Sequence, residues 1–559
     1  MQVGLELQEA IEKALAGFGF PKTVVHLEHP VDPSHGDYST NIALVLAKKE
    51  KKNPQELAEE IVKGLGDMKK LRETVEKVEI AAPGFINFWL SREAFGKELE
   101  QALKDGERYG GGSFGTGRKI LVEFAHPNTH KLFHIGHLRN ITLGESVSRL
   151  LEFVDFDVVR ANYQGDIGLH IAKAMVGIQK LMRDKNLSLN AITKWSSEDK
   201  IHFLGEGYVA GNLLYESDEM KKEVDEMNTL LYTGLSSFRP EEQEKIQNLY
   251  KETRKWSLEY FDKIYKRVGT KFDRLYFESE VAEPGRKLVL DNLGEVFRKD
   301  QGAVIFPGED YSLHNRVFIN SLGLPTYEAK DIGLAGLQLE EFSPDQLIHV
   351  VGPEQKGYFE VVFKAIELVF PKLAGREYHL LYGWVRLKTG KMSSRKGEVV
   401  EGEWLLDETK KRLKEKYEMP EDIAEKVAVG AVKYSMLRLH PASEIAFDID
   451  ESIRLDGDSG PGRLPTTAKS NLTTAVDSKQ WTVGNLEPEE LAILRHFYKF
   501  PEVVRESAEK FSPNILCNFL FELAQKYNAF YNKHRILDPE FVGARRHYSQ
   551  VKLGYCGRP

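Results

Sequence analysis

The sequence contains very little cysteine, with only Cys517 and Cys556 in 559 residues. Two cysteines cannot build a disulfide framework or a cysteine zinc site, which favours the reducing environment of the cytoplasm. Long hydrophobic runs are also missing, and the N-terminus shows no charged-then-apolar leader. We therefore expect a cytoplasmic protein with no membrane span and no structural zinc.

The chain has no excess of positive charge. Its formal net charge is −8, which argues against indiscriminate nucleic-acid binding but allows a basic stripe on one face, because the local field steers binding. A hydrophobic content of 41% and a charged content of 29% are typical of a globular protein with sizeable cores. The length exceeds what one core supports and predicts roughly three to four domains.

The stretch from Lys119 to Asn140 changes from an apolar run to a polar loop and then to the start of a helix. Ile120–Val122 form the apolar run, and a helical apolar period continues to Leu151. This pattern predicts a buried parallel strand, a loop and a helix. A helix N-terminus offers free N–H donors and a positive dipole end, so it is a natural site for phosphate.

The predicted helix begins within His134-Ile135-Gly136-His137. The two histidines share one helical face, so both can hydrogen-bond one anionic group. Gly136 between them lets a flat group approach the backbone closely. Taken alone, the same residues also fit a histidine-rich helix cap or half of a metal site.

A second nucleotide signal lies at Arg386 to Gly397. Its glycines predict a mobile loop, and it is strongly cationic through Lys388, Lys391, Arg395 and Lys396. Such a loop suits a triphosphate, whose charge must be neutralised as pyrophosphate leaves. An exposed basic turn is the alternative for this loop when it is considered alone.

Residues 1–105 predict a separable α+β unit. Helical spacing appears at 42–46 and again after Asn53-Pro54, and alternation around Pro83-Gly84 predicts paired strands over 78–90. The glycine-rich run at 109–117 predicts a flexible linker.

The central part of the chain alternates strand and helix patterns around a long charged helical segment at about 172–265. The predicted strands lie at 158–163, 304–306, 316–319 and 347–351. This order predicts a split, doubly wound nucleotide-binding sheet with ligands at the carboxyl ends of its strands. The loop at 164–168 follows one of these strands and is expected at that edge.

The HIGH and KMSSR stretches, in this order and on these elements, resemble the class I aminoacyl-tRNA synthetases. Within that class the chain resembles the arginyl-tRNA synthetases over nearly its whole length. The stretches that carry this resemblance are GDYSTNIALVLAKK, PGFINFWLS, VEFAHPNTHKLFHIGHLRN, YQGDIGLH, FDRLYFES, PTYEAKDI, HVVGPEQK and GKMSSRKGEVV.

The resemblance implies a multidomain α/β protein. It implies an α+β N-terminal domain at 1–105 that touches the tRNA elbow. It implies a Rossmann-like, doubly wound parallel catalytic domain at 118–400 with a helical insertion at about 172–265. The remainder, 401–559, is implied to be a helical stem and an all-α anticodon-binding bundle.

The implied activity is ATP-dependent ligation of L-arginine to tRNA(Arg) through an arginyl-adenylate, in translation. The partners are then L-arginine, tRNA(Arg) and ATP, with ATP entering as its Mg²⁺ complex. We expect a monomer. Members of this family typically need tRNA before they activate their amino acid, so tRNA dependence is also implied.

The first step needs little covalent work from the protein, so positioning and charge stabilisation must dominate. The resemblance places His134 and His137 against the phosphates and Lys391 on the leaving β- and γ-phosphates. Many class I enzymes carry a second lysine where this chain has Ser394, and Lys131 takes the place of the lysine that supplies this charge in the family. The catalytic residues so implied are His134, His137, Lys131 and Lys391. The implied ATP-binding residues are His134, Gly136, His137, Lys391, Met392, Ser393, Ser394 and Arg395.

A guanidinium is planar with five donors, so its pocket should offer carboxylates and neutral acceptors. Tyr327 and Asp331 are four residues apart and would share a helical face. The resemblance does not settle every role, and it stays open whether one carboxylate faces the substrate's α-amino group instead of the guanidinium. The implied arginine-binding residues are Asn128, Glu278, Tyr327, Asp331 and Gln355.

The chain departs from the family pattern after Pro461. Family members continue into an aromatic, helical Tyr-Leu-Gln run, whereas residues 462–482 here are polar without a helical period, and the end at Pro559 is also atypical. A local frameshift would explain the stretch. Two alternatives stay open: another class I synthetase or HIGH-bearing nucleotidyltransferase, and a non-catalytic or impaired tRNA-binding relative. The length and the Tyr327/Asp331 pair favour the arginine enzyme.

Overall fold

The computed structural model describes residues 2–20, 23–66, 69–234, 236–388, 400–454 and 486–534. The chain forms two compact units. One comprises Met1–Gly112, Arg463–Glu506 and Ile515–Arg558, and the other comprises Ser113–Gly462 with Ser507–Asn514 and Pro559. The polar stretch at 462–482 and the end of the chain lie outside the described residues, so their predicted departure stays a prediction.

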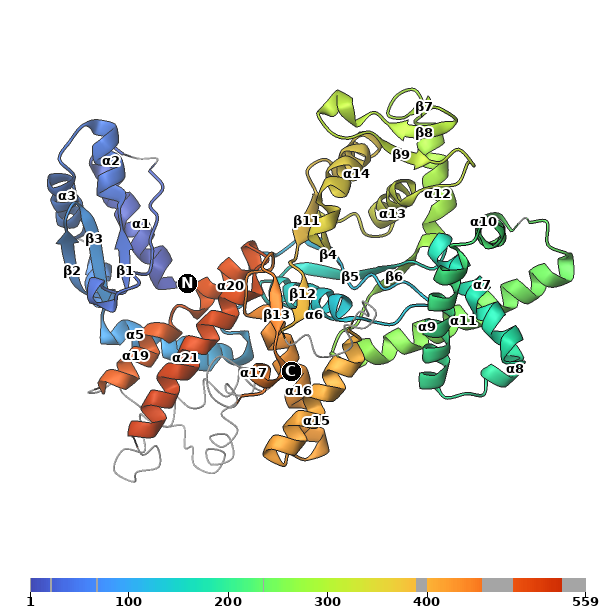
Figure 1. Ribbon diagram of the computed structural model, residues 1–559. Helices are drawn as coiled ribbons and strands as arrows, with labels where there is room; N and C mark the ends of the chain where they lie inside the picture. The colour runs from blue at the N-terminus through green and yellow to red at the C-terminus, as the bar shows by residue number, and fades with distance from the viewer. Residues whose placement is uncertain are drawn as a thin grey trace. The chain divides into compact units, whose positions relative to one another are not determined.

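The N-terminal part of the first unit is an α+β fold, as predicted. Its helices are α1 (Gln2–Gly17), α2 (Ile42–Glu50), α3 (Pro54–Gly66), α4 (Lys69–Thr74) and α5 (Arg92–Asp105) (Figure 1). Its strands β1 (Tyr38–Thr40), β2 (Val75–Ala81) and β3 (Phe85–Leu90) form an antiparallel sheet in the order β1-β3-β2. Strands β2 and β3 are the hairpin predicted around Pro83-Gly84. The Asn53 side chain accepts a hydrogen bond from Gln55 N at 2.9 Å, which helps to start α3 at the predicted place.

Three helices close the described chain: α19 (Pro488–Phe497), α20 (Phe500–Glu509) and α21 (Pro513–Lys533). Glu502 of α20 accepts from Tyr38 Oη at 2.6 Å and pairs with His29 Nε2 at 2.8 Å. Tyr109 is 2% exposed and stacks on Phe497, with ring centroids 5.1 Å apart. Tyr109 therefore belongs to the core of this unit, and the prediction that it starts a flexible linker was wrong because its ring has an aromatic partner distant in sequence.

The second unit is built on a five-stranded parallel sheet. Its strands are β4 (Lys119–Glu123), β5 (Asp157–Gln164), β6 (Arg274–Phe277), β10 (Gln346–Val351) and β11 (Glu377–Leu381). They lie in the order β11-β10-β4-β5-β6, and all pairs are parallel. This is the doubly wound Rossmann order, and the strand order reverses between β4 and β10. Ligands of such sheets lie outside the carboxyl ends of the strands at this reversal.

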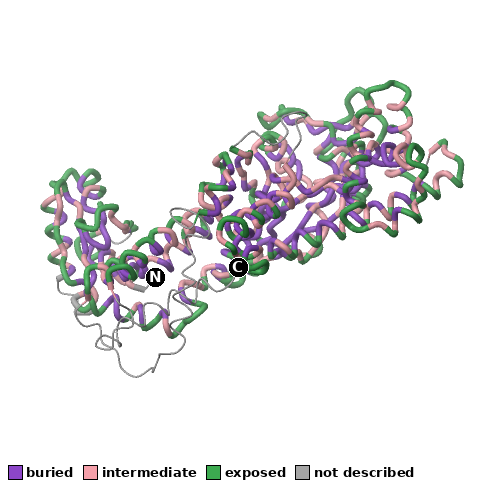
Figure 2. The backbone as a smooth tube through the Cα atoms, turned by 60° about the horizontal axis from the view of Figure 1, so that its bottom comes forward, coloured by how far each residue is buried: buried purple, intermediate pink, exposed green. Residues whose placement is uncertain are grey.

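Helices cover both faces of the parallel sheet. Alternate side chains of a strand point to opposite faces. Leu121 joins a core with α12 (Glu278–Asp291), α13 (Tyr327–Phe342) and α14 (Lys356–Val369). Its buried neighbours Ile120 and Val122 face the other side, where α6 (Ile135–Phe153) packs. Figure 1 shows α13 and α14 above the sheet and α6 below it, and Figure 2 shows buried residues concentrated along these strands. A strand covered on both faces must be apolar throughout, as the Ile120–Val122 run predicted.

Two of the predicted strands do not belong to this sheet. β8 (Ala303–Phe306) and β9 (Arg316–Ile319) pair antiparallel with each other, and β7 (Arg298–Asp300) completes a separate sheet in the order β7-β8-β9. A parallel crossover needs a dozen or more residues, and the connection between β8 and β9 is too short for one. The expectation of strands at 304–306 and 316–319 was therefore right, but their placement in the doubly wound sheet was wrong.

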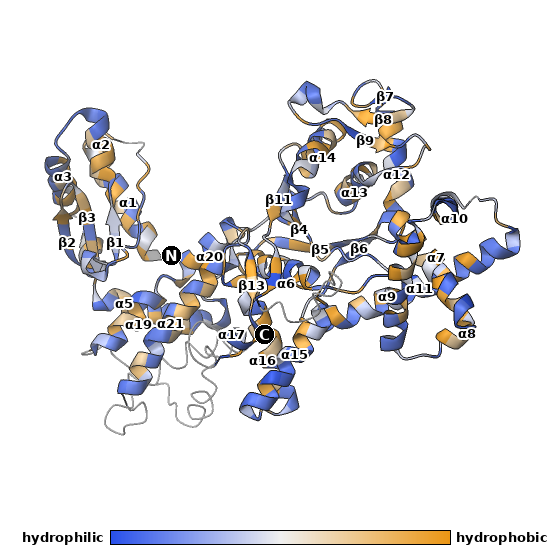
Figure 3. Cartoon of the chain, in the orientation of Figure 1, coloured by the Kyte–Doolittle hydropathy of each residue, from blue (hydrophilic) through white to orange (hydrophobic). Residues whose placement is uncertain are grey.

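The segment between β5 and β6 is helical, as predicted. It consists of α7 (Leu169–Asp184), α8 (Leu189–Ile192), α9 (Ser197–Leu214), α10 (Asp218–Thr233) and α11 (Pro240–Arg267). Further along, the unit contains β12 (Val385–Leu387), α15 (Gly402–Tyr417), α16 (Glu421–Leu437), β13 (Ile445–Phe447) and α17 (Ile449–Ser452). Figure 3 shows that these helices carry mixed polar and apolar surfaces. Within the described ranges, no helix is both long and apolar enough to span a membrane.

Candidate active site

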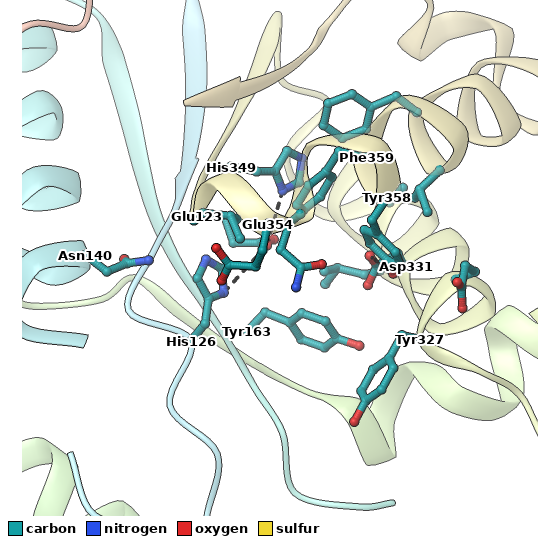
Figure 4. A pocket seen from close by; sticks show the side chains of 18 of the residues that line it. Glu123, His126, Asn140, Tyr163, Tyr327, Asp331, His349, Glu354, Tyr358 and Phe359 are labelled. Carbon is teal, nitrogen blue, oxygen red and sulfur yellow. Dashed lines mark hydrogen bonds and ion pairs between the residues drawn. The ribbon is translucent and has the colours of Figure 1, made fainter. Parts of the chain in front are cut away.

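A cavity of about 530 Å³ lies at the carboxyl ends of β4 and β10, where the strand order of the sheet reverses (Figure 4). Six of the side chains predicted from the sequence line it together: Asn128, His134, His137, Tyr327, Asp331 and Gln355. They come from the loop after β4, the start of α6, the start of α13 and the segment before α14. Both predicted sets, phosphate-binding and arginine-binding, are therefore represented in one cavity.

The loop after β4 is fixed by a side chain of the neighbouring helix α6. Ala125 and His126 have φ angles of +79° and +48°, a left-handed conformation that costs about 1–2 kcal/mol per residue. Asn140 of α6 offsets part of this cost, because its Oδ1 accepts from Ala125 N at 2.6 Å and its Nδ2 donates to Val350 O at 2.6 Å. These bonds fix the start of the loop between β4 and β10, beside the cavity.

The two histidines of the HIGH stretch cap helix α6. His134 Nδ1 accepts from Gly136 N at 3.1 Å and from His137 N at 3.3 Å, while His137 Nδ1 accepts from His134 N at 3.2 Å. Since each Nδ1 acts as an acceptor, the hydrogen of each neutral ring lies on Nε2. The rings stack with centroids 3.6 Å apart, and both line the cavity. The helix start therefore provides two parallel Nε2–H donors.

Both rings are uncharged at neutral pH. Burial, with a smaller contribution from Lys131, lowers the pKa of His134 to about 4. Burial and the neighbouring His134 ring hold the pKa of His137 well below its ordinary value. The site therefore supplies hydrogen-bond donors and a helix dipole rather than a permanent imidazolium charge, and an arriving phosphate would draw these pKa values upward.

The opposite side of the cavity is acidic. Asp331 Oδ2 accepts a hydrogen bond from Tyr358 Oη at 2.7 Å. Among the described residues, no cationic side chain pairs with Asp331, whereas Glu328 on the same wall is paired with Arg316 at 3.1 Å. Burial raises the pKa of Asp331 to about 8. A carboxyl group held this way favours a cationic ligand, because a positive charge would restore its ionised form.

Tyr327 and Asn128 line the same cavity as this carboxyl group. Tyr327 is 54% exposed and lines the cavity from the first residue of α13, so it stands at the opening rather than in a core. Asn128 is fixed against the loop after β5, where a Cβ added to Gly165 would lie 2.0 Å from Asn128 Oδ1. Glycine at 165 is therefore needed for Asn128 to occupy this place.

Glu278 is placed differently from the other predicted residues. It is not among the described residues that line the cavity, and its Oε2 accepts from Lys330 Nζ at 2.5 Å in a buried ion pair. The Lys330 ammonium also lies over the rings of Tyr327 and Tyr232, 4.7 and 5.3 Å from their centroids. A role for Glu278 in binding arginine stays a prediction, and the structure adds Lys330 as its partner.

We expect Lys330→Met to destabilise the second unit by about 3–5 kcal/mol, because it leaves the Glu278 carboxylate buried without a partner. The double variant Lys330→Met/Glu278→Gln should recover most of this loss, since the uncompensated charge is gone. Urea unfolding of the parent, single and double variants measures the difference. Equal losses in the single and double variants would contradict the buried-pair explanation.

The remaining predicted residues are not part of the described cavity lining or fall outside the described chain. Lys131 Nζ lies over the ring of Tyr208 in α9, 4.6 Å from its centroid, and neither Lys131 nor Gly136 is among the described residues that line the cavity. The KMSSR residues fall outside the described ranges: Lys391, Met392, Ser393, Ser394 and Arg395. Their roles stay predictions.

Several cavity residues were missed from the sequence: Glu123, Tyr163, His349 and Tyr358. Glu123 is the last residue of β4, and His349 is its register partner on β10. The Tyr163 hydroxyl is buried with no hydrogen-bond partner in the described structure. The position of Glu123 at the carboxyl end of a predicted central strand was the one available signal. No group of three or more His, Cys, Asp or Glu side chains in the described ranges is arranged to hold a metal ion.

Three family models match successive parts of the chain. The family model for the class I (R) tRNA synthetase catalytic domain matches residues 98–449. The arginyl tRNA synthetase N-terminal domain model matches 5–90, and the DALR anticodon binding domain model matches 465–547, which includes most of the polar stretch.

Similar proteins cover nearly the whole chain. The arginine–tRNA ligase of Treponema denticola is 31% identical, over 95% of this chain and 91% of that protein. The arginine–tRNA ligase of Bdellovibrio bacteriovorus is 29% identical, over 94% of this chain and 90% of that protein. The structure of Thermus thermophilus arginyl-tRNA synthetase superposes with a TM-score of 0.77 at 26% identity, over 98% of this chain and 96% of that chain. This chain therefore belongs to the class I arginyl-tRNA synthetase family.

Proposed function

We propose that the cavity binds L-arginine beside ATP and that the chain ligates arginine to tRNA(Arg). The observation that carries this proposal is the Asp331 carboxyl group, which has no cationic partner among the described residues and shares one cavity with the two Nε2–H donors of α6. A guanidinium supplies the missing positive charge and enough donors for Asp331 and its neighbours. The α6 donors suit the phosphates of ATP.

In the proposed first step, an oxygen of the arginine carboxylate attacks the α-phosphorus of ATP. The bond between that phosphorus and the bridging oxygen to the β-phosphate breaks, and pyrophosphate leaves with the electron pair. His134 and His137 donate through Nε2 to phosphate oxygens, where they stabilise the charge that moves towards the leaving group. Lys391 adds positive charge to the β- and γ-phosphates. In the second step a hydroxyl of the terminal tRNA ribose attacks the adenylate carbonyl, and AMP leaves.

Magnesium enters this proposal with the nucleotide, because triphosphate oxygens are hard ligands that Mg²⁺ prefers. The C-terminal helices bind the anticodon region of tRNA(Arg), and the enzyme acts as a cytoplasmic monomer. The polar stretch at 462–482 weakens the coupling between tRNA binding and activation, because it lies where the bundle begins in sequence. That coupling cannot exceed the difference in tRNA affinity between the resting and competent states.

Comparing arginine with citrulline tests the proposal. Citrulline has nearly the shape of arginine but a neutral ureido group in place of the guanidinium. We expect citrulline to support adenylate formation at least about 100-fold less efficiently, because its neutral ureido group cannot form the ion pair with Asp331 that a guanidinium forms. ATP–pyrophosphate exchange in the presence of tRNA(Arg) measures both substrates. Similar efficiencies for the two would contradict charge-based recognition in this cavity.

A further inference from the structure

His349 lines the cavity and lies between two carboxylates. Its Nδ1 lies 3.2 Å from Glu123 Oε1, and its Nε2 lies 2.6 Å from Glu377 Oε2. The three residues come from adjacent strands, Glu123 from β4, His349 from β10 and Glu377 from β11. All three side chains are at most 8% exposed. No local sequence pattern marks this cluster, and none of its three members acts in the reaction steps proposed above.

The geometry favours a hydrogen on each nitrogen of the His349 ring. An ionised carboxylate only accepts hydrogen bonds, so a ring with a carboxylate oxygen at each nitrogen must carry hydrogens on both. The imidazolium then leaves the three groups with a combined charge of −1. Burial acts to lower the pKa of His349, but Glu123 and Glu377 outweigh it and hold that pKa well above the ordinary value. His349 is therefore charged at neutral pH.

Glu123 and His349 are the two members of the cluster that line the cavity. The Glu123 Oε2 accepts from Nε2 of Gln338, another residue of the cavity lining, at 2.5 Å. Although burial acts to raise it, the neighbouring His349 holds the pKa of Glu123 below its ordinary value. Figure 4 shows Glu123 between His349 and His126, with Asp331 and Tyr358 across the cavity.

Glu377 has no contact with the cavity and an incomplete set of hydrogen bonds. Its Oε1 is buried and has no partner within the described structure. The titratable groups that face His349 from the packed elements are Glu123, His126, Asp331, Glu377 and His379. Two of these carboxylates contact the ring directly. Removing the imidazolium would leave both buried without a counter-charge, so one would have to take up a proton.

We infer that His349 is a positioning residue of the arginine pocket. Its imidazolium charge offsets the charges of both Glu123 and Glu377, and it thereby keeps Glu123 ionised and fixed on the cavity wall. This inference rests on the proposed function, since it concerns the same pocket. The competing explanation is that the cluster only holds the three strands together and has no effect on the charge of Glu123. The two explanations differ in what happens when the second carboxylate is removed together with the histidine.

The first experiment compares two single variants by pyrophosphate exchange with tRNA(Arg). His349→Gln removes the imidazolium charge but keeps a neutral donor. We expect it to raise the KM for arginine at least about tenfold and the KM for ATP by less than about twofold, because a partly protonated Glu123 attracts a cationic substrate less. His379→Gln is the matched control, since His379 is the register partner of His349 on β11 and does not line the cavity. The control should change neither constant by more than about twofold.

The decisive variant is His349→Gln/Glu377→Gln. It leaves Glu123 as the one carboxylate of the trio and restores the combined charge of −1. We expect the KM for arginine to return to within about threefold of the parent, because Glu123 no longer has to share a proton with Glu377. If the cluster only held the strands together, Glu377→Gln would weaken that contact further. A double variant no better than His349→Gln would therefore overturn the inference.

A spectroscopic readout tests the charge directly and does not depend on activity. In the full-length enzyme labelled with ¹³C at histidine Cε1, the His349 signal is identified by its loss in His349→Gln or, if that variant does not fold, in the double variant. We expect an imidazolium signal that does not titrate between about pH 6 and 8, whereas an ordinary histidine changes near about 6.5. A neutral ring at pH 7, or an unchanged KM for arginine in His349→Gln, would overturn the inference. A parent without arginine-dependent exchange would instead contradict the proposed function.

Discussion

Replacing Asp331 by asparagine is expected to raise the KM for arginine by about 100- to 1,000-fold and to change the KM for ATP by less than about threefold. The reason is that a buried guanidinium without its carboxylate costs about 3–5 kcal/mol, and about 1.4 kcal/mol corresponds to a tenfold change in affinity. Asparagine preserves the shape of the side chain and an acceptor for the Tyr358 hydroxyl. Initial-rate exchange kinetics with each substrate varied in turn measures both constants.

The same residue predicts a pH dependence with a definite sign. Since burial raises the pKa of Asp331 to about 8, this carboxyl group is protonated at pH 7 while the cavity is empty. Guanidinium binding favours the ionised form, so it releases a proton. The KM for arginine should therefore fall as pH rises from about 6 to 8, by at most about tenfold per pH unit, and level off above about pH 8. Asp331→Asn should lose this dependence.

The pH dependence of folding stability that arises from Asp331 has the opposite sign: a rise in pH favours arginine binding but lowers stability. The folded-state pKa of Asp331 lies above the unfolded value of about 3.9, so the folded state holds this proton longer. Its contribution to stability is present below about pH 4 and is lost as pH rises towards about 8.

The matched control for Asp331→Asn is Tyr358→Phe, because it removes one hydrogen bond from the cavity wall but no charge. Equal effects of Asp331→Asn on arginine and ATP would contradict the assigned role.

Replacing His137 or Lys391 by alanine is expected to slow adenylate formation by about 100- to 1,000-fold while arginine affinity stays within about threefold of the parent. Both groups interact mainly with charge that develops on the phosphates in the transition state, so turnover suffers more than ground-state binding. Single-turnover formation of arginyl-adenylate, in the presence of tRNA(Arg), measures the rate. Lys391 lies outside the described residues, so its half of this expectation rests on the family resemblance.

His137 also caps α6, and a control separates that role from catalysis. His137→Asn keeps an acceptor at the δ position for His134 N but removes the Nε2–H donor. If the donor matters, the asparagine variant should be nearly as slow as the alanine variant. A parent-like rate for His137→Asn would show that helix capping, not phosphate binding, explains the loss in His137→Ala.

The parts of the site predicted best were those governed by local sequence. The strand at 119–123 and the helix that begins after His134 follow from an apolar run and a capping pattern confined to neighbouring residues. Tyr327 and Asp331 share a helical face because helical periodicity places residues four apart together. These features need no knowledge of the remaining chain, and the structure confirms that all of them meet at one cavity.

The parts that were missed depend on tertiary packing. Glu123 and His349 are 226 residues apart and meet because β4 pairs with β10 in one particular register, which strand periodicity does not specify. The Glu278–Lys330 pair depends on close packing of α12 on α13. A Cβ added to Gly285 would lie 2.0 Å from Ala329 O, so a glycine at 285 permits this approach. Neither the register nor the helix contact leaves a local pattern in the sequence.

ATP–pyrophosphate exchange with each of the twenty amino acids, with and without tRNA(Arg) and at fixed salt, tests the central claim most directly. The salt must be fixed because tRNA contacts through phosphates depend on it. Of the twenty amino acids, only arginine should support exchange, and its stimulation by tRNA(Arg) should be weak because of the polar stretch at 462–482. Exchange driven by a different amino acid, or no exchange with arginine even when tRNA(Arg) is bound, would contradict it.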